Sequence, residues 1–262
     1  DVARLENESV NIQAATQGRT GIDCFDHWAR ELVDTGYLHN HARMWFASIW
    51  IFILGLPWQL GAAFFLRHLL DGDPASNTLS WRWVAGLQTL GKTYLATPDN
   101  IATFTGGRFH PHPLAHGPGP APLTPPKPLP LPTADTMSSG PALLLLTEED
   151  LHTESLPLGH AEIKGIIALP PEPEDLSENV LNFRAAALDD GLRRAALHYA
   201  APVLSDTVLN AAKQLSVSDI VTAYAPVGPT ADHLHALSAA AQQAGIRLHR
   251  VRRAWDSAAW PH

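Results

Sequence analysis

The first ninety residues alternate apolar and polar positions with the period of an α-helix. Between residues 25 and 33, apolar side chains recur at i, i+3, i+4 and i+7, which predicts an amphipathic helix. Nearly every position from 39 to 56 is apolar, so a helix buried on most sides is expected there, ending at Pro57. A third helix is predicted at 60–70, and a fourth begins at Pro74.

The pattern changes after residue 90. Residues 91–110 are rich in Gly and Thr and predict an irregular segment. Residues 111–132 hold ten of the 22 prolines, a composition typical of an extended, semi-rigid connector. A proline-rich segment can also bind an SH3-like domain, but a plain linker is the favoured interpretation.

From residue 140 onward, short apolar runs alternate with helical stretches. Strands are predicted at 142–146, 163–169, 220–225 and 246–251, and helices at 179–199, 205–215 and 230–244. Strands that alternate with helices form a parallel, Rossmann-like sheet. No glycine-rich dinucleotide fingerprint or Walker loop marks a nucleotide pocket in this region.

These patterns predict a chain of three parts. Residues 1–110 form an all-α domain, 111–139 a proline-rich linker, and 140–262 a smaller α/β domain with a parallel sheet. At 262 residues, 45% of them apolar and 17% charged, the chain is long enough to bury a sizeable core.

Composition also bounds the compartment. The single cysteine, Cys24, excludes an internal disulfide and fits a reducing compartment, and no secretory leader is visible, so we expect a cytoplasmic protein. Cys24 lies among aromatic residues and is expected to be an inert core thiol. The apolar run Met44–Trp58 has about 15 residues, fewer than the ~20 that span a bilayer, so we expect a core helix and no membrane contact.

The formal charge is −8, which bears on nucleic acid binding. Residues 1–110 hold eight Arg and Lys against ten Asp and Glu, and residues 111–262 hold ten against sixteen. This balance argues against strong non-specific DNA binding by the whole chain. A local basic patch remains open, formed by Arg43, Arg67, Arg82, Lys92 and Arg108.

Polar side chains interrupt the apolar helices at two points. Asn40 and Arg43 lie three residues apart, on one helix face. Asp71 and Asp73 precede the helix that begins at Pro74, where unsatisfied N–H groups favour an anionic ligand. A few polar groups held among apolar helices suit a large, mostly apolar ligand with hydrogen-bonding edges, such as a flavin.

This segment resembles the FAD-binding helical domain of the DNA photolyase and cryptochrome family. The motifs that carry the resemblance are Thr20-Gly21, Asp26, Arg30, Thr35–Met44, Pro57–Gly61, Leu70–Asp73, Ala75–Asn77 and Trp81–Trp83. They occur in the family's order and spacing over roughly residues 15–95. The resemblance implies FAD as the cofactor and leaves the antenna pigment open.

The resemblance also raises questions of organisation. The family has an α/β domain before its helical domain, whereas an α/β region follows here, and whether the two correspond stays open. The family's phosphate-binding helical portion precedes the equivalent of residue 1. We therefore expect this chain to be a fragment, with a missing N-terminal part of the same protein needed to complete the flavin site.

The resemblance implies a role for each polar residue. The cofactor-binding residues are Asn40, Arg43, Asp71, Gly72, Asp73 and Asn77. Arg43 would pair with Asp71 beside the isoalloxazine ring, Asp73 would bind its polar edge, and Asn77 would face its reactive nitrogen. The alternative is structural, with Asp73 only capping a helix and Arg43–Asp71 only joining two helices. The spacing of the four residues together favours the flavin site.

Further residues match the family's electron-transfer and DNA-binding positions. By resemblance, Trp58 and Trp81 pass electrons between surface and flavin, while Leu5 occupies the position of the outermost tryptophan. Trp28, Trp45, Trp50 and Trp83 are interpreted as core residues, although Trp28, Trp45 or Trp50 can replace the third ring.

The DNA contacts implied by the resemblance are Asn40, His41 and Arg43, with Met44 lining the lesion pocket as a catalytic residue. Histidine at position 41, where the family has a basic residue, weakens phosphate contact at neutral pH. His110, His112 and His116 lie in the proline-rich segment without carboxylate or thiol partners at ligand spacing, so no metal site is expected.

Three functions follow as alternatives. The leading one is FAD-dependent, light-driven repair of damaged DNA by a photolyase-type carbon–carbon lyase, in which reduced flavin donates an electron to a pyrimidine dimer. The second is a cryptochrome-like photoreceptor without repair activity, and the third is a degenerate family member without flavin. Asn77 and Met44 favour the first; the acidic charge, His41 and Leu5 favour the second; the absent phosphate-binding segment favours the third.

Overall fold

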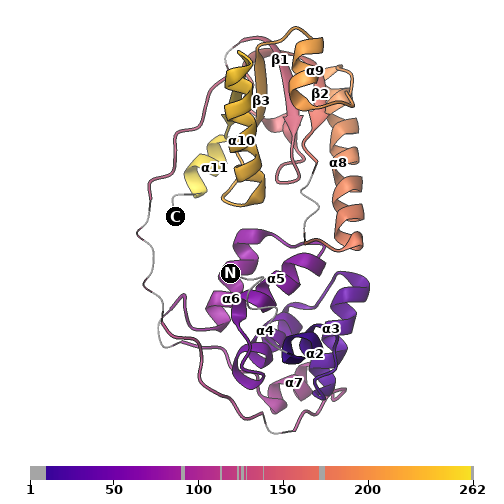
Figure 1. Ribbon diagram of the computed structural model, residues 1–262, viewed down its shortest axis with the longest axis vertical. Helices are drawn as coiled ribbons and strands as arrows, with labels where there is room; N and C mark the ends of the chain where they lie inside the picture. The colour runs from indigo at the N-terminus through magenta and orange to yellow at the C-terminus, as the bar shows by residue number, and fades with distance from the viewer. Residues whose placement is uncertain are drawn as a thin grey trace. The chain divides into compact units, whose positions relative to one another are not determined.

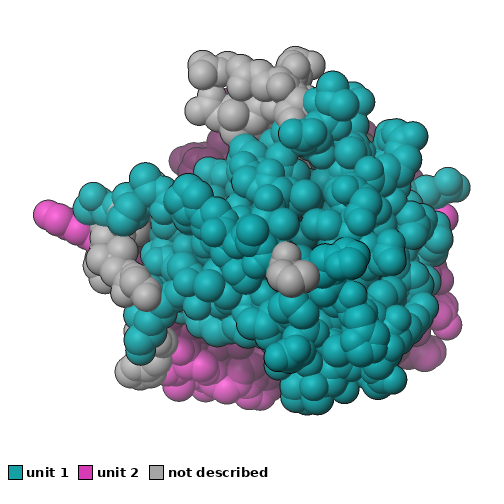
Figure 2. Space-filling view, turned by 90° about the horizontal axis from the view of Figure 1, so that it is seen from below, with its two compact units in different colours: residues 1–126, 175–180 teal, residues 127–174, 181–262 magenta. Residues whose placement is uncertain are grey.

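The computed structural model describes residues 10–89, 92–112, 114–122, 124, 127, 129–137, 139–170 and 175–260. Its contacts divide the chain into two compact units (Figures 1 and 2). The helical unit comprises residues 1–126 and 175–180, and the α/β unit comprises residues 127–174 and 181–262. The boundary after residue 126 falls inside the segment predicted as a linker.

Short helices build the helical unit. They are α2 (Val10–Thr16), α3 (Asp23–Thr35), α4 (Asn40–Ser48), the π-helix η1 (Ile49–Ile53), α5 (Trp58–His68), α6 (Pro74–Val84) and α7 (Pro98–Phe104). Their core is aromatic: Phe25 stacks on Phe46 with ring centroids 4.2 Å apart, and Trp50 is fully buried. None of the helices in the described part of the chain is long and apolar enough to cross a membrane.

Two helices approach each other closely at Gly61 of α5. A Cβ atom at this position would lie 2.2 Å from the ring of Trp81 on α6 and 3.0 Å from Nε1 of Trp50. Glycine therefore lets α6 lie against α5 with an indole ring between them. This packing fixes the face of α6 that turns toward the other helices.

The predicted helix at 39–56 differs from the observed one. It is α-helical only to Ser48 and continues as the π-helix Ile49–Ile53, in which the N–H of Leu54 donates to the carbonyl of Ile49. Four consecutive side chains, Ile49–Phe52, are buried there. Such a segment has no polar face whose period could reveal the wider turn in the sequence.

The irregular segment predicted at 91–110 contains a helix, so that prediction was wrong. Thr97 caps α7 by accepting a hydrogen bond from the N–H of Asn100, and Pro98 occupies the first turn. Ile101 anchors the helix in the core with no exposed surface. Threonine followed by proline is a helix start signal, but the sequence prediction gave more weight to the glycines of the segment.

The beginning of the proline-rich segment packs against the helical unit. The ring Nε2 of His116 lies 3.0 Å from the carbonyl oxygen of Ala96, and the N–H of Gly117 donates to the carbonyl of Phe52. A Cβ atom on Gly119 would lie 2.9 Å from the ring of Phe52. Glycines between the prolines therefore let this backbone lie against an aromatic side chain.

The α/β unit contains one parallel sheet in the order β2-β1-β3-β4. Its elements are β1 (Ser139–Leu146), η2 (Thr153–Ser155), β2 (His160–Ala168), α8 (Glu178–Tyr199), α9 (Val208–Gln214), β3 (Asp219–Ala223), α10 (Pro229–Gln243), β4 (Arg247–Val251) and α11 (Ala254–Ala259). The predicted combination of a helical domain and a parallel α/β region is thereby confirmed.

Helices cover both faces of the sheet (Figure 1). Leu144 and Leu146 of β1 pack in one cluster with Leu188 of α8. The alternate residues of β1, such as Leu145, pack in a second cluster with Leu234 of α10. A strand covered on both faces is apolar throughout, which is why residues 142–146 have no alternating pattern.

Candidate functional site

A cavity of about 270 Å³ lies between α4, α6 and the end of α5. Its lining residues are Asn40, Arg43, Met44, Ala47, Phe65, Leu69, Asp71, Gly72, Asp73, Ser76, Asn77, Ser80, Trp81, Trp83 and Val84. The lining combines apolar side chains with a small number of amides, hydroxyls and charged groups. Such a mixture is typical of sites for cofactors with an apolar ring and polar edges.

Arg43 joins α4 to the turn that precedes α6. Its Nη2 donates to both carboxylate oxygens of Asp71, at 3.1 and 3.0 Å, and its Nε donates to the carbonyl of Leu38 at 2.8 Å. The side chain of Asp71 is 61% exposed, so solvent screens this ion pair and its contribution to stability is small. The pair holds both groups in place at the cavity wall.

The turn before α6 places a carboxylate at the helix N-terminus. A Cβ atom on Gly72 would lie 3.0 Å from the carbonyl oxygen of Leu69, so glycine suits this turn. Oδ1 of Asp73 accepts a hydrogen bond of 2.6 Å from the N–H of Ser76 and caps the helix. Asp73 is therefore a helix cap, and the same side chain also lines the cavity.

Asn77 lies one turn into α6. Its Nδ2 donates to the carbonyl of Ala62 on α5 at 2.8 Å. This bond crosses between the two helices and fixes the plane of the amide at the cavity wall. A fixed amide can discriminate between a donor and an acceptor on a ligand.

The indole N–H of Trp81, at the cavity wall, is a hydrogen-bond donor without an acceptor among the described residues. The side chain is 2% exposed, and its Nε1 has no hydrogen-bond partner among the described residues. A buried, unpaired N–H costs roughly 1–3 kcal/mol. A ligand acceptor that reaches this wall would remove that cost.

Two predicted site residues lie elsewhere. His41 does not line the cavity; its ring contacts Phe104 at 4.8 Å between centroids and Trp45 at 5.5 Å. Trp58 is half-buried and borders a second cavity of about 450 Å³, together with the proline-rich segment 118–121. Leu5 lies outside the described residues.

The tryptophan that contacts Trp81 is Trp50, at 6.2 Å between ring centroids, and the ring of Phe65 lies closer, at 5.1 Å. Trp50 donates from Nε1 to the carbonyl of Pro57, the residue before Trp58. Trp28 and Trp45 stack on each other with centroids 5.4 Å apart and are buried, as expected for core residues.

The sequence did not identify Trp83 as a site residue. It was interpreted as core, but it is 42% exposed, lines the cavity and stacks on Tyr94 with centroids 5.6 Å apart. Ser76 and Ser80 also line the cavity without having been singled out. Their spacing of four residues on the helix of Asp73 was the available signal, because residues four apart share a helix face.

Other motif residues serve the fold. Asp26 is 8% exposed and accepts hydrogen bonds from the N–H groups of Thr20 and Gly21 and from the hydroxyl of Thr20. Arg30 donates to the carbonyl of Gly18 at 2.6 Å. These bonds close the loop before α3. Burial raises the pKa of the Cys24 thiol to about 11, so this thiol is protonated and unreactive at neutral pH.

Comparison with known proteins identifies relatives of the helical unit. Residues 2–104 match the family described as the FAD binding domain of DNA photolyase. A deoxyribodipyrimidine photo-lyase of Vibrio cholerae is 34% identical over 112 residues, which are 42% of this chain and 24% of that protein. Its counterpart in Escherichia coli is 34% identical over 94 residues, 36% of this chain and 20% of that protein.

A plant protein is also similar to part of this chain. Cryptochrome-1 of Arabidopsis thaliana is 40% identical over 101 residues, 38% of this chain and 14% of the plant protein. The chain thus spans about a quarter or less of the length of these relatives. The similarity covers the part of the chain that contains the cavity.

Proposed function

Residues 2–104 of this chain belong to the photolyase and cryptochrome family, and we propose that their cavity takes part in light-driven repair of damaged DNA. The observation that carries this proposal is the gathering of Asn40, Arg43, Asp71, Asp73 and Asn77 around one cavity. These residues come from two helices and the turn between α5 and α6.

FAD is the cofactor of this domain, and the cavity suits its ring system. The unpaired Nε1–H of Trp81 and the fixed amide of Asn77 meet the needs of a ring with carbonyl and N–H edges. When bound and reduced, FAD supplies an electron after it absorbs light. At about 270 Å³ the cavity is slightly below the ~300–1,000 Å³ common for cofactor sites, so it accommodates the ring end rather than the whole dinucleotide.

The protein's own groups set the electrostatics of this site. The positive end of the α6 dipole and the guanidinium of Arg43 offset part of the negative charge at the turn near Gly72, although Pro74 has no N–H and Asp73 already accepts from the N–H of Ser76. Nη2 of Arg43 donates to both carboxylate oxygens of Asp71 and its Nε donates to the carbonyl of Leu38, which keeps the guanidinium oriented without leaving its charge unpaired. Asn77 donates its N–H to Ala62 and so presents a fixed amide to the ring.

Two side chains that line the cavity are suited to contact with a nucleobase. They are Met44 and the exposed indole of Trp83, and an aromatic face stacks on a base that has left the duplex. Asn40, exposed at the start of α4, and His41 lie about one helical turn before Met44 and would contact the backbone of the DNA.

A spectroscopic assay tests this function. The purified full-length parent protein, with the N-terminal part expected to complete the flavin site, should carry flavin absorption in the visible range, and blue light should restore an oligonucleotide that contains a cyclobutane pyrimidine dimer. Asp71→Ala and Asn77→Ala should each lower the retained flavin about tenfold, whereas His112→Ala should retain it fully. Unchanged flavin content in both cavity variants would refute the site assignment.

The second candidate is a cryptochrome-like photoreceptor without repair activity. It is supported by the excess of acidic over basic residues and by His41 at a position where a basic side chain would bind phosphate. The same assay separates the two functions. Flavin that responds to blue light while the dimer stays intact would support the photoreceptor, and a protein that binds no flavin would contradict both.

A further inference from the structure

The α/β unit has a topological switch point at the carboxyl edge of its sheet. From β1 the chain passes to β2 on one side, and from β3 it passes to β4 on the other. The connections that leave β1 and β3 therefore diverge. In open α/β sheets, ligands bind in the crevice outside the strands at such a point.

A small cavity of about 20 Å³ lies at this edge. It is lined by Thr147, Glu148, Leu169, Pro170, Pro229, Thr230 and His233. These residues follow β1 and β2 or begin α10. A group the size of water needs roughly 10–15 Å³, so the cavity admits one hydroxyl-sized group and no more.

Two polar groups at this cavity lack a hydrogen-bond partner within the described residues. Thr147 is 2% exposed, and its Oγ1 is unpaired. Oε1 of Glu148 accepts a 2.8 Å hydrogen bond from Arg184 on α8, while its buried Oε2 is unpaired. One hydroxyl between them could donate to the carboxylate and accept from the threonine.

The N-terminus of α10 lies beside the same cavity. Its cap residue is Gly228, which has no side chain, and Pro229 lacks an N–H. The N–H groups that follow in this 15-residue helix therefore have no side-chain cap. A helix N-terminus of this kind favours a phosphate group.

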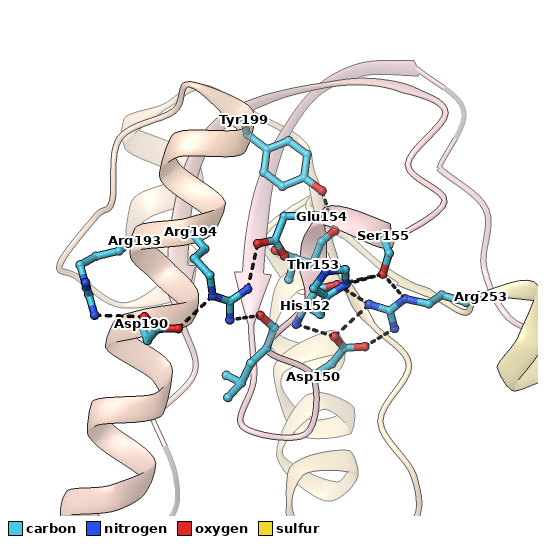
Figure 3. Close-up of polar contacts among 11 residues, drawn as sticks. Asp150, His152, Thr153, Glu154, Ser155, Asp190, Arg193, Arg194, Tyr199 and Arg253 are labelled. Carbon is cyan, nitrogen blue, oxygen red and sulfur yellow. Dashed lines mark hydrogen bonds and ion pairs between the residues drawn. The ribbon is translucent and has the colours of Figure 1, made fainter.

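A second Thr–Glu pair on the same loop provides an internal comparison (Figure 3). Thr153 is 1% exposed with an unpaired Oγ1, and Glu154 pairs with Arg194 of α8 at 2.9 Å while its Oε2 is unpaired. This pair does not line the cavity. Tyr199 donates to the carbonyl of Thr153, so this part of the loop is tied to α8 (Figure 3).

We propose that the carboxyl edge of this sheet binds a sugar phosphate, either free or as part of a nucleotide. One sugar hydroxyl enters the cavity between Thr147 and Glu148, and the phosphate lies on the N-terminus of α10. The carboxylate of Glu148 repels a phosphate, which places the neutral hydroxyl in the cavity and the anion at the helix. One ligand would thereby give hydrogen-bond partners to Oγ1 of Thr147, to Oε2 of Glu148 and to the first N–H groups of α10.

Calorimetric titration of the full chain with ribose 5-phosphate, AMP, ribose and inorganic phosphate tests this site. Ribose 5-phosphate and AMP should bind with saturation, and ribose or phosphate alone at least tenfold more weakly. Tighter binding of AMP than of ribose 5-phosphate would identify the ligand as a nucleotide. Thr147→Val and Glu148→Gln should each weaken binding about tenfold.

Matched controls separate this site from general effects. Thr153→Val and Glu154→Gln remove equivalent groups that do not line the cavity and should leave binding unchanged. Asp71→Asn alters the first cavity and should also leave it unchanged, so the outcome does not depend on the flavin proposal. The inference is overturned if neither ribose 5-phosphate nor AMP binds with saturation, or if inorganic phosphate binds as tightly as they do. It is also overturned if the control variants lose as much affinity as Thr147→Val and Glu148→Gln.

Discussion

Cys24 lies in the aromatic core of the helical unit, where water does not reach its thiol. Burial raises its pKa from about 9 to about 11, so the folded protein holds this proton more tightly than the unfolded chain. The contribution of this thiol to stability should therefore be constant below pH 9 and be lost between pH 9 and 11. The loss should approach about 2–3 kcal/mol, following ~1.4 kcal/mol for each pKa unit.

The matched variant is Cys24→Ala. Urea unfolding across pH 8–11 should show the variant losing less stability with pH than the parent protein. Burial also raises the pKa of Tyr199 to about 12, but that effect is present in both proteins and cancels in the difference. Parallel pH profiles for the two proteins would show that the thiol does not titrate as stated.

At the scale of residues, the sequence correctly predicted cavity-lining residues where they lie within one helical turn or one loop of each other. Asn40 and Arg43 share a helix face, and Asp71 and Asp73 share a turn, so their proximity followed from helix geometry. Trp83 was misjudged although residues two positions apart lie on roughly opposite sides of a helix, so Trp81 and Trp83 cannot both face the core, and the sequence alone did not show which of the two is buried. Only the packing of α6 against α5 decides which indole is buried.

At the scale of elements, Asp73 has two roles that variants can separate: it caps α6 and it lines the cavity. Asp73→Ser keeps an oxygen that can accept from the N–H of Ser76 but removes the carboxylate, whereas Asp73→Ala removes both. The alanine variant should lose about 1 kcal/mol of stability, and the serine variant almost none. Both should retain less flavin if the carboxylate contacts the cofactor.

Thermal unfolding and visible absorption, measured on the same samples, check this prediction. Full flavin retention by Asp73→Ser would assign the residue to the cap alone. Thr97→Ala, which removes the cap of α7, is the control for stability, because Thr97 does not line the cavity.

The close approach of α5 and α6 depends on Gly61, because glycine has no side chain. In Gly61→Ala the added methyl would lie 2.2 Å from the ring of Trp81, so one helix or the indole must move. Overpacking of this kind costs roughly 1–3 kcal/mol, which exceeds the gain in helix propensity of about 1 kcal/mol. The control is Ala63→Ser, on the exposed face of α5. Gly55→Ala is not suitable because Gly55 has a positive φ, so an alanine there would be strained.

Unfolding by urea should show Gly61→Ala destabilised and Ala63→Ser close to the parent. Trp81 is the ring displaced by the methyl, so its fluorescence should also change in the folded variant. A variant as stable as the parent would mean that α5 and α6 do not pack as closely as described.

Elements with local start signals were predictable, and those shaped by burial were not. Pro74 after Asp73 marks the start of α6 in the sequence, and the observed cap confirms it. The π-helix has no such signal, because Ile49–Ile53 is apolar at every position and its wider turn depends on the surrounding helices. The strand order likewise could not be predicted, because β1 pairs with both β2 and β3 across long stretches of sequence.

At the scale of the whole molecule, charge limits how DNA can be bound. The chain has a net charge of −8, and several arginines of the helical unit are engaged: Arg43 with Asp71, Arg67 with Asp175, and Arg30 with Gly18. Arg82 and Lys92 have no ion pair within the described residues and remain available for phosphates. In the proposed complex with DNA, base stacking on Trp83 would then supply much of the affinity.

This balance predicts a weak dependence of DNA affinity on salt. Each phosphate neutralised by a cation contributes about −0.9 to the slope of log K against log salt, so two or three contacts give a slope near −2 to −3. Arg82→Gln should make the slope about one unit shallower, whereas Trp83→Ala should weaken binding at every salt concentration and leave the slope unchanged. Fluorescence anisotropy with a dimer-containing oligonucleotide at 50–200 mM salt measures both quantities. A slope steeper than about −5 would mean that more than about five phosphates are neutralised, which would contradict the two or three contacts expected here.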